Sequence, residues 1–380
     1  MKLPSGNVLR YYIWRFFSGF HFIYTLQALF LLSKGITPGQ LALFASVTTI
    51  SITLLEIPTG YIADKFSRRL SVSLGYFFGG LAMLGFIFIH NFSELLVISF
   101  LIGLSEALKS GATESLLYDD LKDIGKEVNY LSVTSKSSSA ATISGAIATF
   151  LGPILYIVNT SIPFILTSVA NFFVVFLTLG FRENKASHEV KKEIKILDGV
   201  LVILKNHNIR LLVLMDVILL VFVNIYYQVL YSPKIISLGL PLQYLGALDV
   251  VSLLMMTGML LILPRLVIKN EKMNLALYTL LPAIVFIAFG ISKNLVPAVI
   301  LGMTFDLAWS ARRHIIPTIT NLYFTSHDRA LSISSMSFVS NLIAALLIPI
   351  TFSIFNINYL FALVPGLVIV FLLYIYREKK

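Results

Sequence analysis

Three acidic residues lie inside long apolar stretches of this sequence and could carry proton chemistry. They are Glu106, Asp306 and Asp216. A carboxylate in a medium of low dielectric binds a proton more readily than one in water, so it can take up and release protons near neutral pH. We therefore expect these residues, Glu106 and Asp306 before Asp216, to be candidates for coupling the movement of protons to another process.

The composition indicates which medium surrounds these carboxylates. The 380 residues are 57% hydrophobic and 13% charged, whereas soluble domains are roughly 45–50% apolar and about 25% charged. A helix needs about 20 residues to cross the hydrocarbon core of a bilayer, and apolar runs of that length fill nearly the whole chain. The sequence therefore predicts an all-α polytopic membrane protein.

Motifs of soluble enzymes are absent from the sequence. It contains no H-E-x-x-H, no G-x-S-x-G and no G-x-x-x-x-G-K-[ST], and it has no cysteine. These absences argue against hydrolytic chemistry, against thiolate metal sites and against ATP as an energy source. We expect no enzyme activity, no cofactor and no metal site, and an activity that draws on ion gradients.

Turn and charge signals divide the chain into twelve candidate transmembrane helices. They cover about 8–32, 39–64, 70–89, 93–121, 127–156, 160–181, 208–232, 241–267, 273–291, 294–322, 328–355 and 358–376. With both termini in the cytoplasm, the inner segments hold 21 Lys and Arg residues and the outer loops hold 3. This bias follows the positive-inside rule. It predicts a multi-pass protein of the cell (inner) membrane whose basic residues face lipid headgroups rather than nucleic acid.

A long polar connection and an internal repeat divide these helices into two sets of six. We expect residues 1–181 to form one six-helix bundle, 182–207 a cytoplasmic linker, and 208–380 a second bundle. The linker favours an amphipathic surface helix and a solvated segment equally. At an offset of 200 residues, "EALKSG" from Glu106 returns as "DLAWSA" from Asp306, and "LSVTSKS" from Leu131 returns as "LSISSMS" from Leu331. The repeat predicts two pseudo-symmetric bundles that enter the membrane in the same sense.

The segment "GYIADKFSRR", residues 60–69, resembles the G-x-x-x-D-[RK]-x-x-R-[RK] signature of the major facilitator superfamily (MFS). The wider runs "EIPTGYIAD", "SGATESLLYDDL" and "DRALSISSMS" resemble a prokaryotic branch of drug and metabolite transporters in that superfamily. The resemblance covers the whole chain and implies the twelve-helix MFS fold. It also implies a cytoplasmic latch, made in the outward-open state and broken in the inward-open state, which would comprise Gly60, Asp64, Lys65, Arg68, Arg69, Asp119 and Asp120.

Other charged residues also lie in the apolar stretches of the first half, and we expect them to share one depth, nearer the cytoplasmic side. Because a charge at mid-bilayer costs roughly 2.5–3.5 kcal/mol, such residues usually pair, face a cavity or serve transport. Mutual pairing is the simplest explanation. We expect a buried network of charges formed by Arg15, Glu56, Lys109, Glu114 and Lys136.

The resemblance also implies a central cavity lined by polar and aromatic residues. The candidates for substrate contact are His21, Tyr24, Gln27, Asn224, Tyr227, Gln228 and Tyr231. The leading hypothesis is a monomeric secondary transporter that works by alternating access and exports amphiphilic or cationic small molecules in exchange for protons. The alternatives are proton symport or facilitated uptake of a small polar solute, and a transporter fold that serves as a lipid translocator or a sensor.

Overall fold

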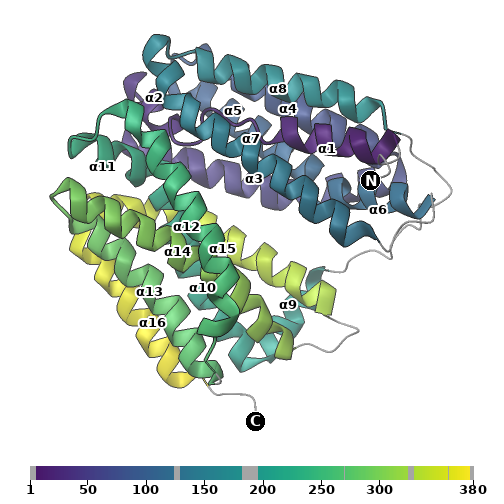
Figure 1. The fold of residues 1–380 in the computed structure, drawn as a ribbon. Coiled ribbons are helices and arrows are strands. Elements are labelled where there is room, and N and C mark those ends of the chain that lie inside the picture. The colour runs from purple at the N-terminus through teal and green to yellow at the C-terminus, as the bar shows by residue number, and fades with distance from the viewer. Residues whose placement is uncertain are drawn as a thin grey trace. The chain divides into compact units, whose positions relative to one another are not determined.

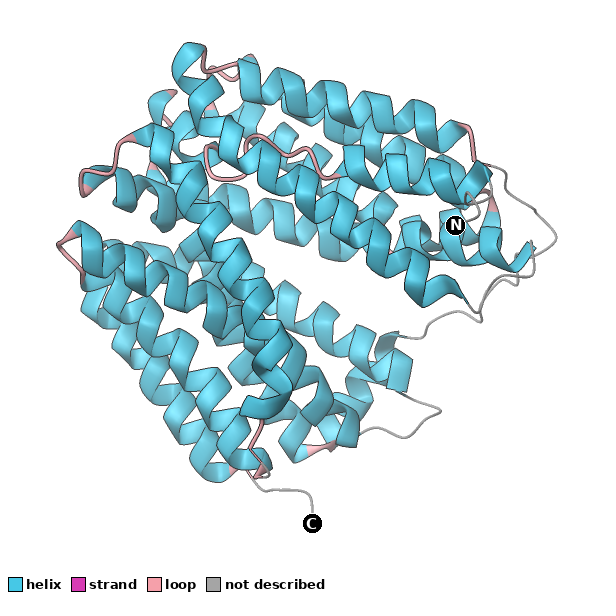
Figure 2. Cartoon of the chain, viewed as in Figure 1, coloured by secondary structure: helices cyan, strands magenta, loops and turns pink. Residues whose placement is uncertain are grey.

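The computed structural model describes residues 6–123, 129–181, 196–268, 270–323, 329–357 and 359–376. These ranges consist of helices joined by short loops and contain no strand (Figure 2). Ten helical segments within them are long and apolar enough to cross a membrane, and a shorter apolar helical segment covers Tyr359–Ile375. The predicted class, an all-α polytopic membrane protein, is confirmed.

The chain folds into two compact units. Among the described residues, the first unit takes those within Met1–Ile36, Val47–Lys192 and Leu242–Ala247, and the second takes those within Thr37–Ser46, Glu193–Pro241 and Leu248–Lys380.

The first unit contains the helices from the N-terminal half of the chain (Figure 1). They are α1 (Gly6–Ser18), α2 (Gln27–Ser33), most of α3 (Pro38–Lys65), α4 (Arg68–Ile87), α5 (Phe92–Lys109), α6 (Ala112–Asp123), α7 (Tyr130–Val158) and α8 (Ile162–Leu179). Helix α4 packs against both α5 and α8, and α1 packs against α7 and α8. Side-chain caps fix two of the starts, because Ser67 accepts a hydrogen bond from the Leu70 amide and Asn91 accepts one from the Glu94 amide.

The second unit contains the helices from the C-terminal half. They are α9 (Ile196–Lys205), α10 (His207–Ile225), the π-helical turn η3 (Tyr226–Leu230), α11 (Tyr231–Ser237), most of α12 (Leu245–Leu266), α13 (Glu271–Ile291), α14 (Leu295–Thr320), α15 (Arg329–Ile357) and α16 (Leu363–Ile375). Helix α13 packs against α14 and α16, and α10 packs against α15. The predicted surface helix of the linker overlaps α9, which packs against α15, although residues 182–195 lie outside the described ranges.

The first predicted span, 8–32, is wrong as a continuous helix. Helix α1 ends at Ser18 and α2 begins at Gln27, and the segment between them is not helical. The chain packs closely against α7 at the start of this break, where a Cβ at Gly19 would lie 2.2 Å from the Ala141 carbonyl oxygen. Hydropathy does not reveal this break, because the apolar run continues through it.

The fourth predicted span, 93–121, is also divided. Helices α5 and α6 are joined at Ser110 and Gly111, and Gly111 has φ +67°. That left-handed conformation suits glycine, which lacks a Cβ. The joint turns the chain at the depth where the sequence places Glu106 and Lys109.

Candidate functional site

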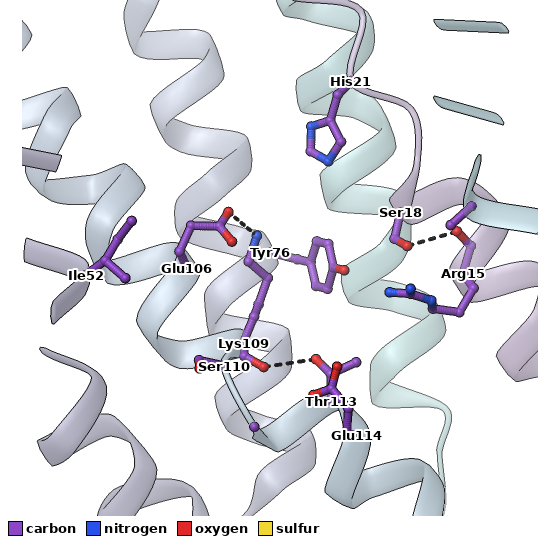
Figure 3. Close-up of a pocket in the computed structure, with 12 residues that line it drawn as sticks. Arg15, Ser18, His21, Ile52, Tyr76, Glu106, Lys109, Ser110, Thr113 and Glu114 are labelled. Carbon is purple, nitrogen blue, oxygen red and sulfur yellow. Dashed lines mark hydrogen bonds and ion pairs between the residues drawn. The ribbon is translucent and has the colours of Figure 1, made fainter. Parts of the chain in front are cut away.

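A cavity of about 550 Å³ opens inside the first unit, within the roughly 300–1,000 Å³ typical of small-molecule sites. Its wall is mostly polar and carries charges of both signs (Figure 3). The lining residues are Arg15, Ser18, His21, Ile52, Tyr76, Glu106, Lys109, Ser110, Gly111, Thr113, Glu114 and Ala141. The structure therefore brings His21 and Glu106 together with three of the five residues of the expected charge network.

One wall of this cavity comes from the broken first span. Arg15 lies in the last turn of α1 and His21 in the break that follows. The break is held by a hydrogen bond from the Phe22 amide to Thr167 Oγ1 (3.1 Å) on α8. Non-helical backbone at membrane depth is tolerated where it is buried in protein or lines a cavity, so the break places these two side chains on the wall.

The opposite wall carries an ion pair between neighbours on α5. Lys109 Nζ lies 2.6 Å from Glu106 Oε1, and Nζ also lies 4.9 Å from the centre of the Tyr76 ring, which favours the cation further. Gly75 makes room for the lysine, since a Cβ there would lie 2.7 Å from Lys109 Cγ. Glu106, a proton-coupling candidate from the sequence, is thus partnered by a cation.

The joint between α5 and α6 is tied to α3. Ser110 Oγ donates a 2.6 Å hydrogen bond to Glu56 Oε1, and Thr113 Oγ1 donates one to the Lys109 carbonyl oxygen (3.0 Å). These bonds fix the turn that holds Lys109 at the cavity. Glu56, assigned from the sequence to the charge network, accepts here from a neutral hydroxyl.

Arg15 is the second cation at the cavity. Its guanidinium carbon lies 5.9 Å from the centre of the Trp14 ring, and its Nε is buried without a hydrogen-bond partner. No acidic group within the described residues forms an ion pair with it. Figure 3 shows Arg15 and Glu106 on opposite sides of Tyr76. A guanidinium at the wall of a cavity and without a carboxylate partner can bind an anionic group.

A second polar cluster occupies the interior of the second unit. Asp306, on α14, is 7% exposed and accepts a 2.7 Å hydrogen bond from the Tyr227 hydroxyl. Asp249, on α12, accepts a 2.8 Å hydrogen bond from the Tyr231 hydroxyl. The aromatic partners flank the π-helical turn η3 or lie in it, and π-helical turns are frequent at functional sites.

The remaining proton-coupling candidate, Asp216, is paired. Arg312 Nη1 lies 2.8 Å from Asp216 Oδ1, and the two side chains are 4% and 25% exposed. This pair joins α10 to α14. Of the three candidates, Asp306 therefore differs from the other two, because its hydrogen-bond donor is a neutral hydroxyl.

The latch residues make contacts inside the first unit. Arg68 binds Asp64 Oδ1 through Nε (3.1 Å) and Nη2 (2.9 Å), and Arg69 donates a 3.0 Å hydrogen bond to the Phe181 carbonyl oxygen. Lys65 Nζ lies 5.4 Å from the centre of the Tyr61 ring. The side chains of Asp119 and Asp120 lie outside the described residues. The latch assignment stays a prediction.

The other candidates are not among the residues that line the cavity of the first unit. Lys136 is exposed on α7, Gly60 has open space around it, and Asn224 donates to the Leu220 carbonyl oxygen of its own helix. Tyr24 lies in the break of the first span, Gln27 at the start of α2 and Gln228 in η3. None of these six side chains lines the cavity of the first unit.

The sequence interpretation missed two residues of these sites. Tyr76 gives no motif, and its role depends on the packing of α4 against α5. Tyr226 is fully buried beside Phe305, with ring centres 4.1 Å apart. Its position in the tyrosine-rich run 226–231 is the one signal that the sequence offers. Within the described ranges no group of three or more His, Asp or Glu could hold a metal ion.

The fold is that of a polytopic membrane protein with a charged interior, and comparison with known proteins shows the family to which it belongs. The family model described as Major Facilitator Superfamily matches residues 12–322. The chain therefore belongs to the major facilitator superfamily.

A curated relative and solved structures agree with this placement. The uncharacterized MFS-type transporter YxaM of Bacillus subtilis (strain 168) is 26% identical over 141 residues, which are 37% of this chain and 34% of the relative. The alignment thus spans about a third of the relative's length. A crystal structure of the nucleoside transporter NupG has a TM-score of 0.78 at 13% identity and covers 99% of this chain and 100% of its own. A crystal structure of a D-xylose-proton symporter has a TM-score of 0.69 at 12% identity, with coverage of 98% and 97%.

Proposed function

We propose that this protein is a proton-coupled secondary transporter of a small polar solute, in which the cavity of the first unit binds the solute and Asp306 binds the proton. Both termini would lie in the cytoplasm. In alternating access, the occupied cavity and the protonated carboxylate would bias the same conformational equilibrium.

The observation that carries the proton assignment is the environment of Asp306. It is buried, it accepts from Tyr227, and no cation forms an ion pair with it among the described residues. A buried carboxylate with a neutral partner can exist in a protonated and an ionised form, whereas a paired one is held ionised by its cation. Glu106 and Asp216 are paired with Lys109 and Arg312, so they support the assignment less well.

The lining of the cavity supports a polar cargo. Among its side chains only Ile52 and Ala141 are aliphatic, whereas pockets for drug-like amphiphiles are lined mainly by apolar and aromatic groups. The geometry therefore favours a small polar solute over the amphiphilic cargo of the leading sequence hypothesis.

Proteoliposomes with a pH-sensitive dye in the lumen test this function. Amino acids, nucleosides and sugars are added one at a time, and a solute that enters with protons acidifies the lumen, whereas one that exchanges for protons makes it alkaline. Asp306→Asn should abolish the proton signal and leave solute counterflow intact. The double variant Asp216→Asn/Arg312→Gln should keep both, because it removes a charge pair. Wild-type proton movement in Asp306→Asn would refute the assignment.

A further inference from the structure

We propose that the cavity of the first unit binds a zwitterionic solute, a small molecule that carries both a carboxylate and an ammonium group. This inference rests on the proposed transport function and deepens it by naming the class of solute. Three features of the cavity carry it: a cation without an ion-pair partner, accessible acidic oxygens, and a wall with zero net charge.

The cation is Arg15. Its Nε is buried without a hydrogen-bond partner, and its guanidinium has no ion pair among the described residues. A charged group that is removed from water is destabilised unless it finds a counter-ion. A guanidinium can bind a carboxylate through two parallel hydrogen bonds, so the carboxylate of a solute would satisfy Arg15.

The acidic groups are Glu106 and Glu114. The Glu106 side chain is 49% exposed and lines the cavity, and Lys109 contacts one of its two oxygens, Oε1. Glu114 also lines the cavity and forms no ion pair within the described part of the chain. These oxygens can accept the hydrogen bonds of an ammonium group.

The balance of charge separates a zwitterion from a simple ion. Arg15 and Lys109 carry two positive charges, and Glu106 and Glu114 carry two negative charges, with His21, which also lines the cavity, counted as neutral. A monovalent solute would leave the loaded cavity with a net charge inside the protein, where charges are weakly screened. A zwitterion adds no net charge and offers one group to each wall. The opposed positions of Arg15 and Glu106 about Tyr76 suit such a dipole (Figure 3).

Equilibrium binding to the purified full-length protein in lipid nanodiscs tests this inference without any gradient. The zwitterionic probes are glycine, β-alanine, 4-aminobutanoate, 5-aminopentanoate and 6-aminohexanoate. Each has a matched anion and cation of equal chain length, such as pentanoate and pentylamine for 5-aminopentanoate. We expect saturable thermal stabilisation by one or more of the aminoalkanoates and none by the matched ions at the same concentration.

Variants assign the two ends of the solute. Arg15→Gln should weaken binding of the aminoalkanoate roughly tenfold or more, because it removes the partner of the carboxylate. Glu114→Gln should also weaken binding of the aminoalkanoate, because it removes an acceptor for the ammonium group. Lys293→Gln removes one positive charge from an exposed loop and should leave binding unchanged. Melting of each variant without probe shows whether the fold is retained.

Two outcomes would overturn the inference. One is stabilisation by pentanoate or pentylamine that equals the effect of 5-aminopentanoate, which would show recognition of a single charge. The other is no stabilisation by any aminoalkanoate. Either result leaves the proposed function standing if another polar solute still moves protons through Asp306. Conversely, zwitterion binding by the wild type together with full proton movement in Asp306→Asn would refute the proton assignment and leave this inference standing, so the two failures are distinguishable.

Discussion

The ion pair between Asp216 and Arg312 provides a quantitative test of the structure. Two unit charges about 4 Å apart attract each other by about 4 kcal/mol at an effective dielectric constant of about 20. The Arg312 side chain is 4% exposed and the Asp216 side chain is 25% exposed. The arginine therefore depends on its counter-ion more strongly than the aspartate does, because the aspartate retains contact with solvent.

This asymmetry predicts unequal effects of the single variants. Asp216→Asn leaves a guanidinium buried without a counter-ion and should lower the free energy of unfolding by about 3–5 kcal/mol. Arg312→Gln leaves a partly exposed carboxylate and should lower it by about 1–3 kcal/mol. The loss in free energy of unfolding in the double variant should be about 2–3 kcal/mol smaller than the sum of the two single losses.

Equilibrium unfolding in mixed micelles with increasing sodium dodecyl sulfate measures all four free energies. The proteoliposome assay measures proton-coupled transport by the same four proteins. Effects that add within about 0.5 kcal/mol would show that the two side chains do not interact. Loss of proton coupling in a well-folded double variant would show that Asp216 has a role beyond pairing, and the structural interpretation of this residue would then be wrong.

Two further predictions concern packing in the first unit. Gly75→Ala places a Cβ 2.7 Å from Lys109 Cγ, so it should lower the free energy of unfolding by about 1–3 kcal/mol. It should also weaken solute binding in the cavity. Thermal melting with and without solute would show both effects. Thr178→Val removes the acceptor of the Trp14 Nε1 hydrogen bond (2.8 Å, buried) and should lower the free energy of unfolding by about 1–3 kcal/mol, because the indole N–H is left without a partner.

Matched substitutions outside these contacts provide the controls. Gly258→Ala introduces a Cβ on α12 where no atom lies within 4 Å, and Thr257→Val removes a hydroxyl that bonds to the carbonyl of its own helix. Both should change stability by less than about 0.5 kcal/mol or stabilise slightly. Equal losses in the free energy of unfolding in the Gly75 and Gly258 variants, or in the two threonine variants, would contradict these packing contacts.

Composition and periodic signals were sufficient to predict the helical class and most of the spans. The boundaries of α3, for instance, are Pro38–Lys65 against a prediction of 39–64. Such boundaries are readable because charge and turn residues mark where the apolar runs end. The break after Ser18 has no such mark, and the close packing of Gly19 on Ala141 at its start is a tertiary contact that hydropathy does not encode. The π-helical turn is likewise a change of backbone register that hydropathy does not encode.

The candidate site was predictable in residue types more than in partners. The sequence placed Glu106 and Lys109 on one helix face at i and i+3, where side chains are neighbours, and the structure pairs them. It could not pair Asp216 with Arg312, which are 96 residues apart in the chain. Partners on different helices depend on how the helices pack, and equal depth alone leaves several pairings open.

The internal repeat explains why the two mid-membrane carboxylates differ. At the offset of 200 residues, Lys109 corresponds to Trp309. Glu106 therefore has a cation at i+3, whereas Asp306 has an indole there. This difference between the repeats accompanies a different partner for each acid, since Glu106 pairs with Lys109 and Asp306 accepts from Tyr227.

Trp309→Lys tests this explanation by restoring the cation of the first repeat. The new ammonium, one turn from Asp306, should favour the ionised carboxylate and so impair its protonation. We expect the variant to lose most of the proton signal in proteoliposomes while solute counterflow persists. Trp309→Gln, which introduces no charge, separates the effect of the cation from the loss of the ring. If the lysine variant moved protons as the wild type does and the fold were intact, the environment of Asp306 would not be what sets its capacity to bind a proton.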